Sequence, residues 1–87
     1  MRQPSFYNGV GYDTLSFGVV FSKEAIFDAY KLQYYLEHLG GMMRVKGVFH
    51  TNHQWMSYNK VGEDIAALYP SFYRKDSRLE VLLSVDN

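Results

Sequence analysis

The feature of this sequence that most limits its fold is a change in the spacing of its apolar residues. Between Tyr12 and Phe21, apolar residues alternate with small or polar ones, which is typical of a strand with one buried face. From Ala25 to Leu39, apolar residues recur every three or four positions, which is typical of an amphipathic helix. The chain is therefore expected to begin its fold with a strand followed directly by one long helix.

Residues with known preferences for helix ends flank the helical segment. Ser22 precedes it, and a serine hydroxyl at the N-cap accepts hydrogen bonds from the free N–H groups of the first turn. Gly40 and Gly41 follow it, and glycine adopts the left-handed conformation after a helix without steric cost. His38 lies in the last turn, where we expect its ring to cap backbone carbonyls.

Alternation returns in the second half of the chain. It predicts strands over residues 43–51, 55–61 and 79–85, the first two joined as a hairpin. Residues 64–69 fit either a short strand or one helical turn before Pro70. The order of elements predicts an α+β fold, in which a mainly antiparallel sheet of four to five strands carries one long helix on one face. The first strand, the helix and the next strand are expected to form a split βαβ unit with a ferredoxin-like tendency.

The length of 87 residues fits one domain. Residues 1–11 contain Pro4 and two glycines without clear periodicity, which predicts a tail or linker, and residues 12–87 are the predicted domain. No apolar stretch reaches the roughly 20 residues of a membrane helix. The N-terminus also lacks the apolar region of a signal peptide. We therefore expect a cytoplasmic protein without a membrane partner.

Charge and cysteine content exclude several classes of function. Nine Lys and Arg balance nine Asp and Glu, whereas non-specific binding of nucleic acid needs a basic surplus. Because cysteine is absent, the chain can form no disulfides, zinc thiolate sites or catalytic thiols. No nucleophile–base set and no phosphate-binding glycine motif is recognisable. We therefore expect no catalytic residues and no enzyme activity in this chain.

Basic residues occupy strand positions opposite the predicted core. Arg44 and Lys46 share one face of the second strand, and Arg78 has the same orientation in the last strand. This sheet face is expected to be left uncovered by the chain, so the three cations could contact a phosphate or carboxylate of a partner. The alternative is a solvated face on which Glu80, Asp76 and Asp64 balance the positive charge.

Aromatic residues make up 17% of the chain, which is high for a domain with a small interior. Phe27, Tyr30 and Tyr34 form a second stripe on the predicted helix, rotated away from its apolar face. The stripe either covers the edge of the core or provides an exposed docking patch for a partner protein or a second copy of the chain.

His50 and His53 form an H-x-x-H pair that could share a zinc or cobalt ion transiently. Residues three apart on an extended strand point to opposite faces, so only a turn at Asn52 would bring the two rings together. The alternative is that both are ordinary hairpin residues, and we expect no permanently bound cofactor.

Several segments in order resemble the C-terminal domain of the CobW family of GTP-dependent metallochaperones, over about residues 12–85. The closest likeness is Arg-Val-Lys-Gly-Val-Phe-His-Thr at residues 44–51. The other matching segments are residues 15–21, 27–39, 55–59 and 76–81, the last containing Asp-Ser-Arg-Leu.

The resemblance implies a role in the handling of metals. CobW-like proteins couple GTP hydrolysis to the delivery of zinc or cobalt, for example in cobalamin biosynthesis, through an N-terminal domain with a P-loop and a C-x-C-C motif. Neither motif occurs in this chain. The resemblance thus implies a non-catalytic regulatory domain that contacts the GTPase domain, a client metalloprotein or a sister subunit. The family's last strand is usually followed by a helix, whereas this sequence ends at Asn87.

These observations lead to one functional expectation and two alternatives. We expect a protein-interaction domain whose leading contact residues are Arg44, Lys46 and Arg78. The first alternative is a metal-relay domain that uses His50 and His53. The second is a self-associating structural domain that pairs through the aromatic stripe.

Overall fold

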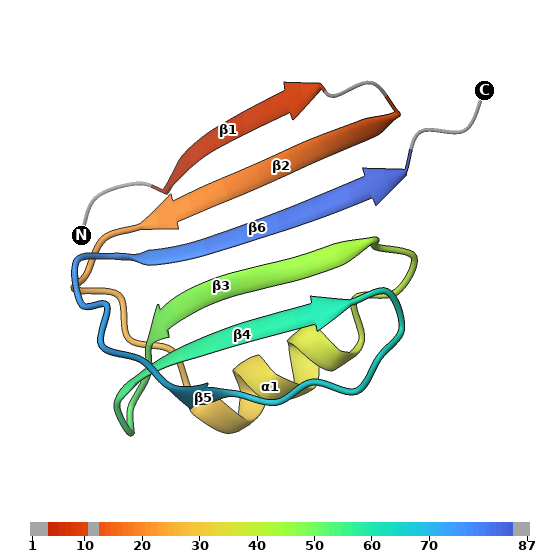
Figure 1. Cartoon of the computed structure of the whole chain (residues 1–87). Helices are drawn as coiled ribbons and strands as arrows, with labels where there is room; N and C mark the ends of the chain where they lie inside the picture. Colours follow the sequence, from red (N-terminus) through yellow and green to blue (C-terminus); the bar gives the residue numbers. More distant parts are fainter. Residues whose placement is uncertain (1–3, 11–12, 85–87) are drawn as a thin grey trace.

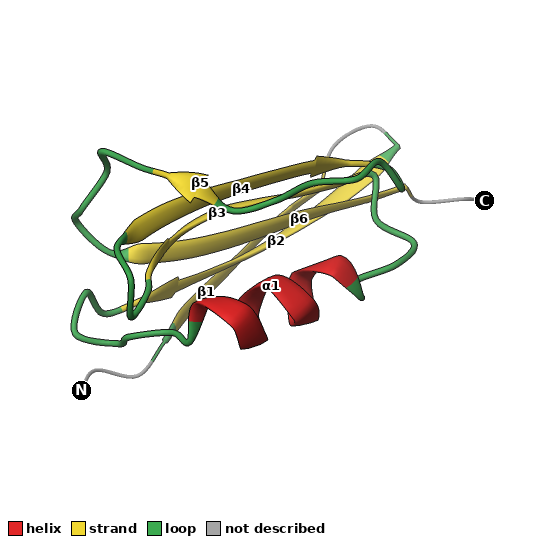
Figure 2. Cartoon of the chain, turned by 90° about the horizontal axis from the view of Figure 1, so that it is seen from below, coloured by secondary structure: helices red, strands yellow, loops and turns green. Residues whose placement is uncertain are grey.

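Six strands of the described residues form one antiparallel sheet, and Figure 2 shows a helix on one of its faces. The computed structural model describes residues 4–10 and 13–84. The elements in chain order are β1 (Ser5–Val10), β2 (Thr14–Phe21), α1 (Ala29–Glu37), β3 (Arg44–His50), β4 (Trp55–Val61), β5 (Tyr69–Pro70) and β6 (Ser77–Ser84). The predicted α+β class is confirmed, but the predicted number of strands is wrong because β1 and β5 enlarge the sheet.

The strand order is β1-β2-β6-β3-β4-β5, so the last strand of the chain lies in the middle of the sheet (Figure 1). β6 pairs antiparallel with both β2 and β3, and these two strands therefore run in the same direction. Because α1 connects them, β2, α1 and β3 form a βαβ unit whose strands are separated by β6. This arrangement brings residues near position 80 between residues near positions 18 and 46.

The prediction of a tail over residues 1–11 is wrong for Ser5–Val10, which form β1 and pair with β2 along their whole length. Most side chains of this edge strand are exposed, so burial does not impose a clear alternation of apolar and polar residues on it. The ring of Tyr7 packs on Gly18, where a Cβ would come within 1.9 Å of the ring. Residues 1–3 and Gly11 lie outside the described residues.

The helix is nine residues long and begins later than predicted. Asp28, and not Ser22, is its N-cap, since the Asp28 carboxylate accepts a hydrogen bond from the backbone N–H of Lys31 at 2.9 Å. The Ser22 hydroxyl instead accepts from the N–H of Glu24 at 3.3 Å and closes a turn. The prediction of a long helix from Ala25 is therefore wrong.

A long-range contact explains the later start. The N–H of Phe27 donates to the carbonyl of His50, and the N–H of Asn52 donates to the carbonyl of Phe27, both at 2.9 Å. These bonds hold Phe27 extended beside the β3–β4 turn, where it cannot be helical. The Asn52 side chain then accepts from the N–H of Ala29 and satisfies a free donor of the first helical turn.

The end of the helix is close to the prediction. Gly41 adopts the left-handed conformation with a φ of 75°. The Nδ1 atom of His38 lies 2.7 Å from the carbonyl oxygen of Tyr34, so the predicted capping role of His38 is confirmed. The helix itself ends at Glu37, one residue before this cap.

The core lies between α1 and the β3, β4 and β6 strands. Its most buried side chains are Leu32, Leu36, Val45, Phe49 and Tyr58. The Tyr58 hydroxyl is buried without a hydrogen-bond partner among the described residues, and burial, together with the charge of Glu37, raises the pKa of this tyrosine. None of the described residues belongs to a helix with the length and apolar content needed to span a bilayer.

Candidate functional site

The face of the sheet opposite α1, called the open face below, carries the three basic residues singled out in the sequence. Arg44 and Lys46 lie on β3, and Arg78 lies on the neighbouring strand β6, where it pairs with Val48. All three line one shallow hollow of about 530 Å³. The prediction that they share a sheet face is confirmed, and the structure brings them into a single surface feature.

Lys46 and Glu80 form the centre of the hollow. They are directly opposed across β3 and β6, and the Lys46 ammonium lies 3.4 Å from the Glu80 carboxylate. The Tyr7 hydroxyl from β1 donates to the other oxygen of Glu80 at 3.2 Å. Partial burial, and the hydrogen bond to the Glu80 charge, raise the pKa of Tyr7 above its usual value. Glu80 thus links strands that are far apart in the sequence.

Arg78 is held by a second acidic residue. Its Nε and Nη2 atoms donate to the two carboxylate oxygens of Asp76 at 2.7 and 3.2 Å, a bidentate pair. The Tyr73 hydroxyl also donates to Asp76, at 2.9 Å. The hydrogen bond from Arg78 lowers the pKa of Asp76, and the same bond raises the pKa of the guanidinium. Both groups are therefore charged at neutral pH.

Arg44 is the third cation of the hollow, and a neutral residue holds it in place. Its Nε donates to the amide oxygen of Asn59 at 3.0 Å. Each arginine still has N–H donors beyond those used within the chain, since a guanidinium offers five. The side chains of Lys46 and Arg78 are about half exposed, at 46% and 50%. The hollow thus presents three fixed cations against two carboxylates, and it can accept a carboxylate or phosphate group of a partner.

The predicted aromatic stripe is divided between two environments. Phe27 precedes the helix and packs edge-on against Phe21 and Phe49, with ring centroids 5.1 and 5.7 Å apart. It therefore covers the edge of the core. Tyr30 and Tyr34 lie on the exposed face of α1. The three residues do not form one continuous patch.

The two histidines of the H-x-x-H pair have different neighbours. The His50 ring stacks on Trp55 at 4.6 Å, and its Nδ1 atom lies 2.6 Å from the carbonyl oxygen of Lys23. The His53 ring meets Tyr30 edge-on at 6.0 Å. Within residues 4–10 and 13–84, no group of three or more His, Cys, Asp or Glu side chains is arranged to hold a metal ion. The metal-relay hypothesis remains a prediction.

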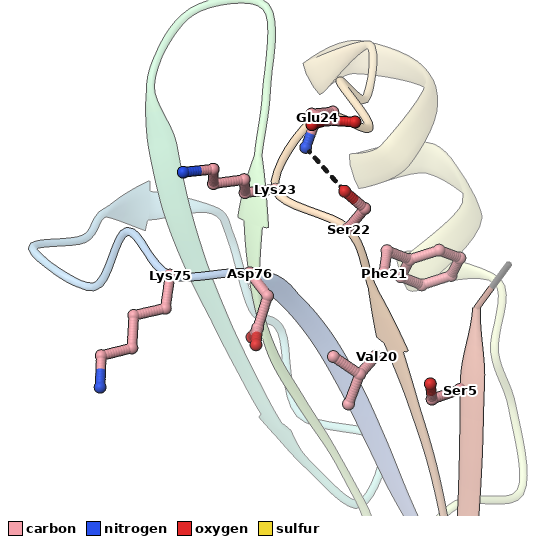
Figure 3. A pocket seen from close by; sticks show the side chains of 8 residues that line it. All are labelled: Ser5, Val20, Phe21, Ser22, Lys23, Glu24, Lys75 and Asp76. Carbon is pink, nitrogen blue, oxygen red and sulfur yellow. Dashed lines mark hydrogen bonds between the residues drawn. The ribbon is translucent and has the colours of Figure 1, made fainter. Parts of the chain in front are cut away.

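A second hollow, of about 460 Å³, lies at the end of the sheet where β2 ends and β6 begins. Figure 3 shows the side chains that line it, with Lys23 and Lys75 on one side and Phe21 and Ser5 on the other. The lining residues include no nucleophile beside a base, and their charges are mixed. This hollow therefore offers no catalytic arrangement.

Sequence reasoning missed the partners that hold the cations in place. Tyr7 was hidden in the predicted tail, because the mostly exposed residues of β1 show no clear alternation of apolar and polar side chains. Tyr73 lies in a segment without periodicity, so no sequence signal points to it.

Comparison of the chain with protein-family models, with curated proteins and with solved structures gave no match. The choice of a function therefore depends on the residues of this chain and on their geometry.

Proposed function

We propose that this chain is a non-catalytic interaction domain of a CobW-like, GTP-dependent metallochaperone for zinc or cobalt, and that it docks a partner protein through the open face. The observation that carries the proposal is the convergence of Arg44, Lys46 and Arg78 in one hollow. No helix of the described residues covers that hollow, because α1 lies on the other face of the sheet (Figure 2).

The chemistry of the hollow favours an acidic partner surface. Three cations are held against two carboxylates, which leaves a local positive surplus on a chain of zero net charge. A preformed arrangement of cations loses little side-chain entropy when it meets a carboxylate. The expected partner is a GTPase domain that bears Asp or Glu residues at its docking site, and the association rate should fall as salt is added.

The test compares two charge-reversed variants of equal composition. Arg44→Glu with Lys46→Glu changes the hollow. Arg74→Glu with Lys75→Glu makes the same change in net charge at two residues between β5 and β6 that do not line it. Binding to a CobW-family GTPase domain with its P-loop and C-x-C-C motif is measured by titration calorimetry. We expect Kd to rise at least about tenfold, or about 1.4 kcal/mol, for the first variant.

The control variant should bind within about twofold of the original chain, since rim charges outside an interface contribute little. Circular dichroism of both variants confirms that the sheet is intact. If the first variant binds as tightly as the unchanged chain, or if the unchanged chain does not bind, the proposed function is wrong.

A further inference from the structure

Among residues 4–10 and 13–84, β1 is an outer strand of the sheet and pairs with another strand on one side only (Figure 1). Its sequence, Ser-Phe-Tyr-Asn-Gly-Val, contains no charged residue and no proline. Proteins that remain monomeric usually protect such an edge with Lys, Pro, a bulge or a covering loop, because unpaired backbone groups bind other strands readily. The six residues of β1 have neither Lys nor Pro, so their free backbone groups form a surface suited to strand pairing.

Apolar side chains extend this surface on the side of the sheet that carries α1. Phe6 is 79% exposed and Val10 is 83% exposed, although both point to the same side as the core. An apolar groove of about 540 Å³ runs between α1 and these strands. Its lining includes Phe6, Val19, Phe21, Ile26, Tyr35 and Leu79, and the charged Asp28 and Lys31 lie at its helix side. Contiguous exposed apolar surface of this kind marks interaction sites in soluble domains.

The charge pattern identifies the occupant. β1 and β2 together contain no Asp, Glu, Lys or Arg, although charged residues make up 21% of the chain. In a two-fold interface between identical molecules, each charge near the axis meets its own copy and is repelled. An acidic or basic partner would find no complementary charge on these strands, whereas a second copy of the chain meets no like charge on them.

We propose that two copies of this chain associate through β1, paired antiparallel about a two-fold axis perpendicular to the sheet. The sheet then continues from one copy into the other, and both helices lie on the same side. The face of each β1–β2 pair that carries the exposed phenylalanines then forms one continuous apolar surface between the two helices. This association uses the outer edge of β1, whereas the proposed docking hollow lies on the open face, to which β1 contributes Tyr7.

The alternation of side chains determines the register of the pairing. Residues directly opposite each other in an antiparallel pair point to the same side of the sheet. One residue of β1 must therefore lie directly opposite the same residue of the second copy, with the two-fold axis between them. With Asn8 on the axis, Phe6 lies opposite Val10 of the second copy and Tyr7 lies opposite Gly9. With Tyr7 on the axis, Phe6 would face the polar Asn8. Apolar pairing favours the first register.

The first experiment measures molar mass by sedimentation equilibrium from micromolar to millimolar concentration. The unchanged chain should approach twice its mass of 10.1 kDa. Val10→Lys puts a charged side chain opposite Phe6 of the second copy and should raise the dimer dissociation constant at least tenfold. Ile65→Lys is the matched control, because Ile65 is also exposed but lies between β4 and β5. A monomer at every concentration, or a Val10→Lys dimer as stable as the original, overturns the proposal.

The second experiment tests the register and exploits the absence of cysteine. Across an antiparallel pair, opposed Cα atoms lie about 4.5–5.5 Å apart, within the range that a disulfide spans. Asn8→Cys should therefore give a covalent dimer on mild oxidation. The two Phe6 positions would be roughly 13 Å apart along the strands, so Phe6→Cys should not cross-link. Equal cross-linking of the two variants, or none in either, overturns the pairing.

The two proposals fail independently. Arg44→Glu with Lys46→Glu leaves β1 unchanged and should retain the dimer, whereas Val10→Lys leaves the docking hollow unchanged.

Discussion

The β1–β2 side and the β3–β4 side of the sheet consist of strands of similar length. The apolar faces of these two sides are covered to different extents. On β3, Phe49 is 1% exposed because α1 packs over it. On β2, Phe17 points to the same side of the sheet but is 42% exposed. The helix lies over β3 and β4, with its first residues beside Asn52 and its last beside Lys60, and it leaves β2 uncovered.

The charge distribution follows the same division. The strands next to the helix carry Arg44, Lys46, Lys60, Arg78 and Glu80, whereas β1 and β2 carry no charged residue. One side of the sheet is stabilised by contacts within the chain and has a polar outer face free to meet a partner. The other side keeps apolar residues that no helix of the described chain covers, as a surface completed by a second molecule would.

The largest expected effect is a difference in the free energy of unfolding between alanine variants of Phe49 and Phe17. Phe49→Ala removes a fully buried ring and should lower the free energy of unfolding by about 3–5 kcal/mol. Phe17→Ala removes a half-exposed ring and should cost about 1 kcal/mol or less. Urea unfolding of both variants is measured in the Val10→Lys background, so that association does not contribute. Similar losses at the two positions would show that the comparison between the two sides is wrong.

Two glycines give a smaller but independent contrast. A Cβ on Gly47 would come within 2.5 Å of the Arg78 carbonyl, which belongs to the backbone of the neighbouring strand, and within 2.7 Å of the Phe49 ring. Gly47→Ala should therefore cost about 2–3 kcal/mol. A Cβ on Gly18 would instead meet the ring of Tyr7, whose side chain can rotate away.

Gly18→Ala should consequently cost about 1 kcal/mol or less, mainly through loss of the hydrogen bond from Tyr7 to Glu80. Thermal unfolding of the two variants under the same conditions measures the difference. A larger loss at Gly18 than at Gly47 would contradict the view that the side next to the helix is the more rigidly packed.

Strands with one buried face could be predicted from the sequence. The predicted range 55–61 is that of β4, and alternation placed Val45 and Phe49 inside and Arg44 and Lys46 outside. The physical reason is that burial of one face imposes a period of two. The same period of two predicts that Arg44, Lys46 and Arg78 share one face of the sheet.

The remainder depends on contacts between distant residues. Ser22 has a suitable side chain for an N-cap, but backbone bonds from Phe27 to the β3–β4 turn make Asp28 the first capping position. The bond from Tyr7 to Glu80 requires that β6 lie beside β2, which no local pattern indicates. Local sequence therefore predicts which side chains face outward, and the strand order decides which of them meet.

The smallest expected effect is a dependence of stability on pH. We expect it from the strands next to the helix, which carry the charged residues, and not from β1 and β2. The hydrogen bond from Arg78, together with that from Tyr73, lowers the pKa of Asp76 below its ordinary value of 3.8. A carboxyl whose pKa is lower in the folded state stabilises the fold above its unfolded pKa, and this contribution is lost as the pH falls through the folded pKa. Asp76→Asn should remove about 0.5–1 kcal/mol at neutral pH, a small value because Arg78 is half exposed.

The difference between Asp76→Asn and the original chain should then shrink toward zero as the pH falls through the lowered pKa of Asp76, where this carboxyl becomes protonated. Urea unfolding at neutral and acid pH measures this change, and Asp13→Asn, an exposed carboxylate beside β2, is the matched control. A loss of equal size at both pH values would mean that Asp76 acts through its shape and hydrogen bonds. A loss that disappears with acid would show that the charge of Asp76 fixes Arg78 in the hollow, in the conformation that a partner's carboxylate would meet.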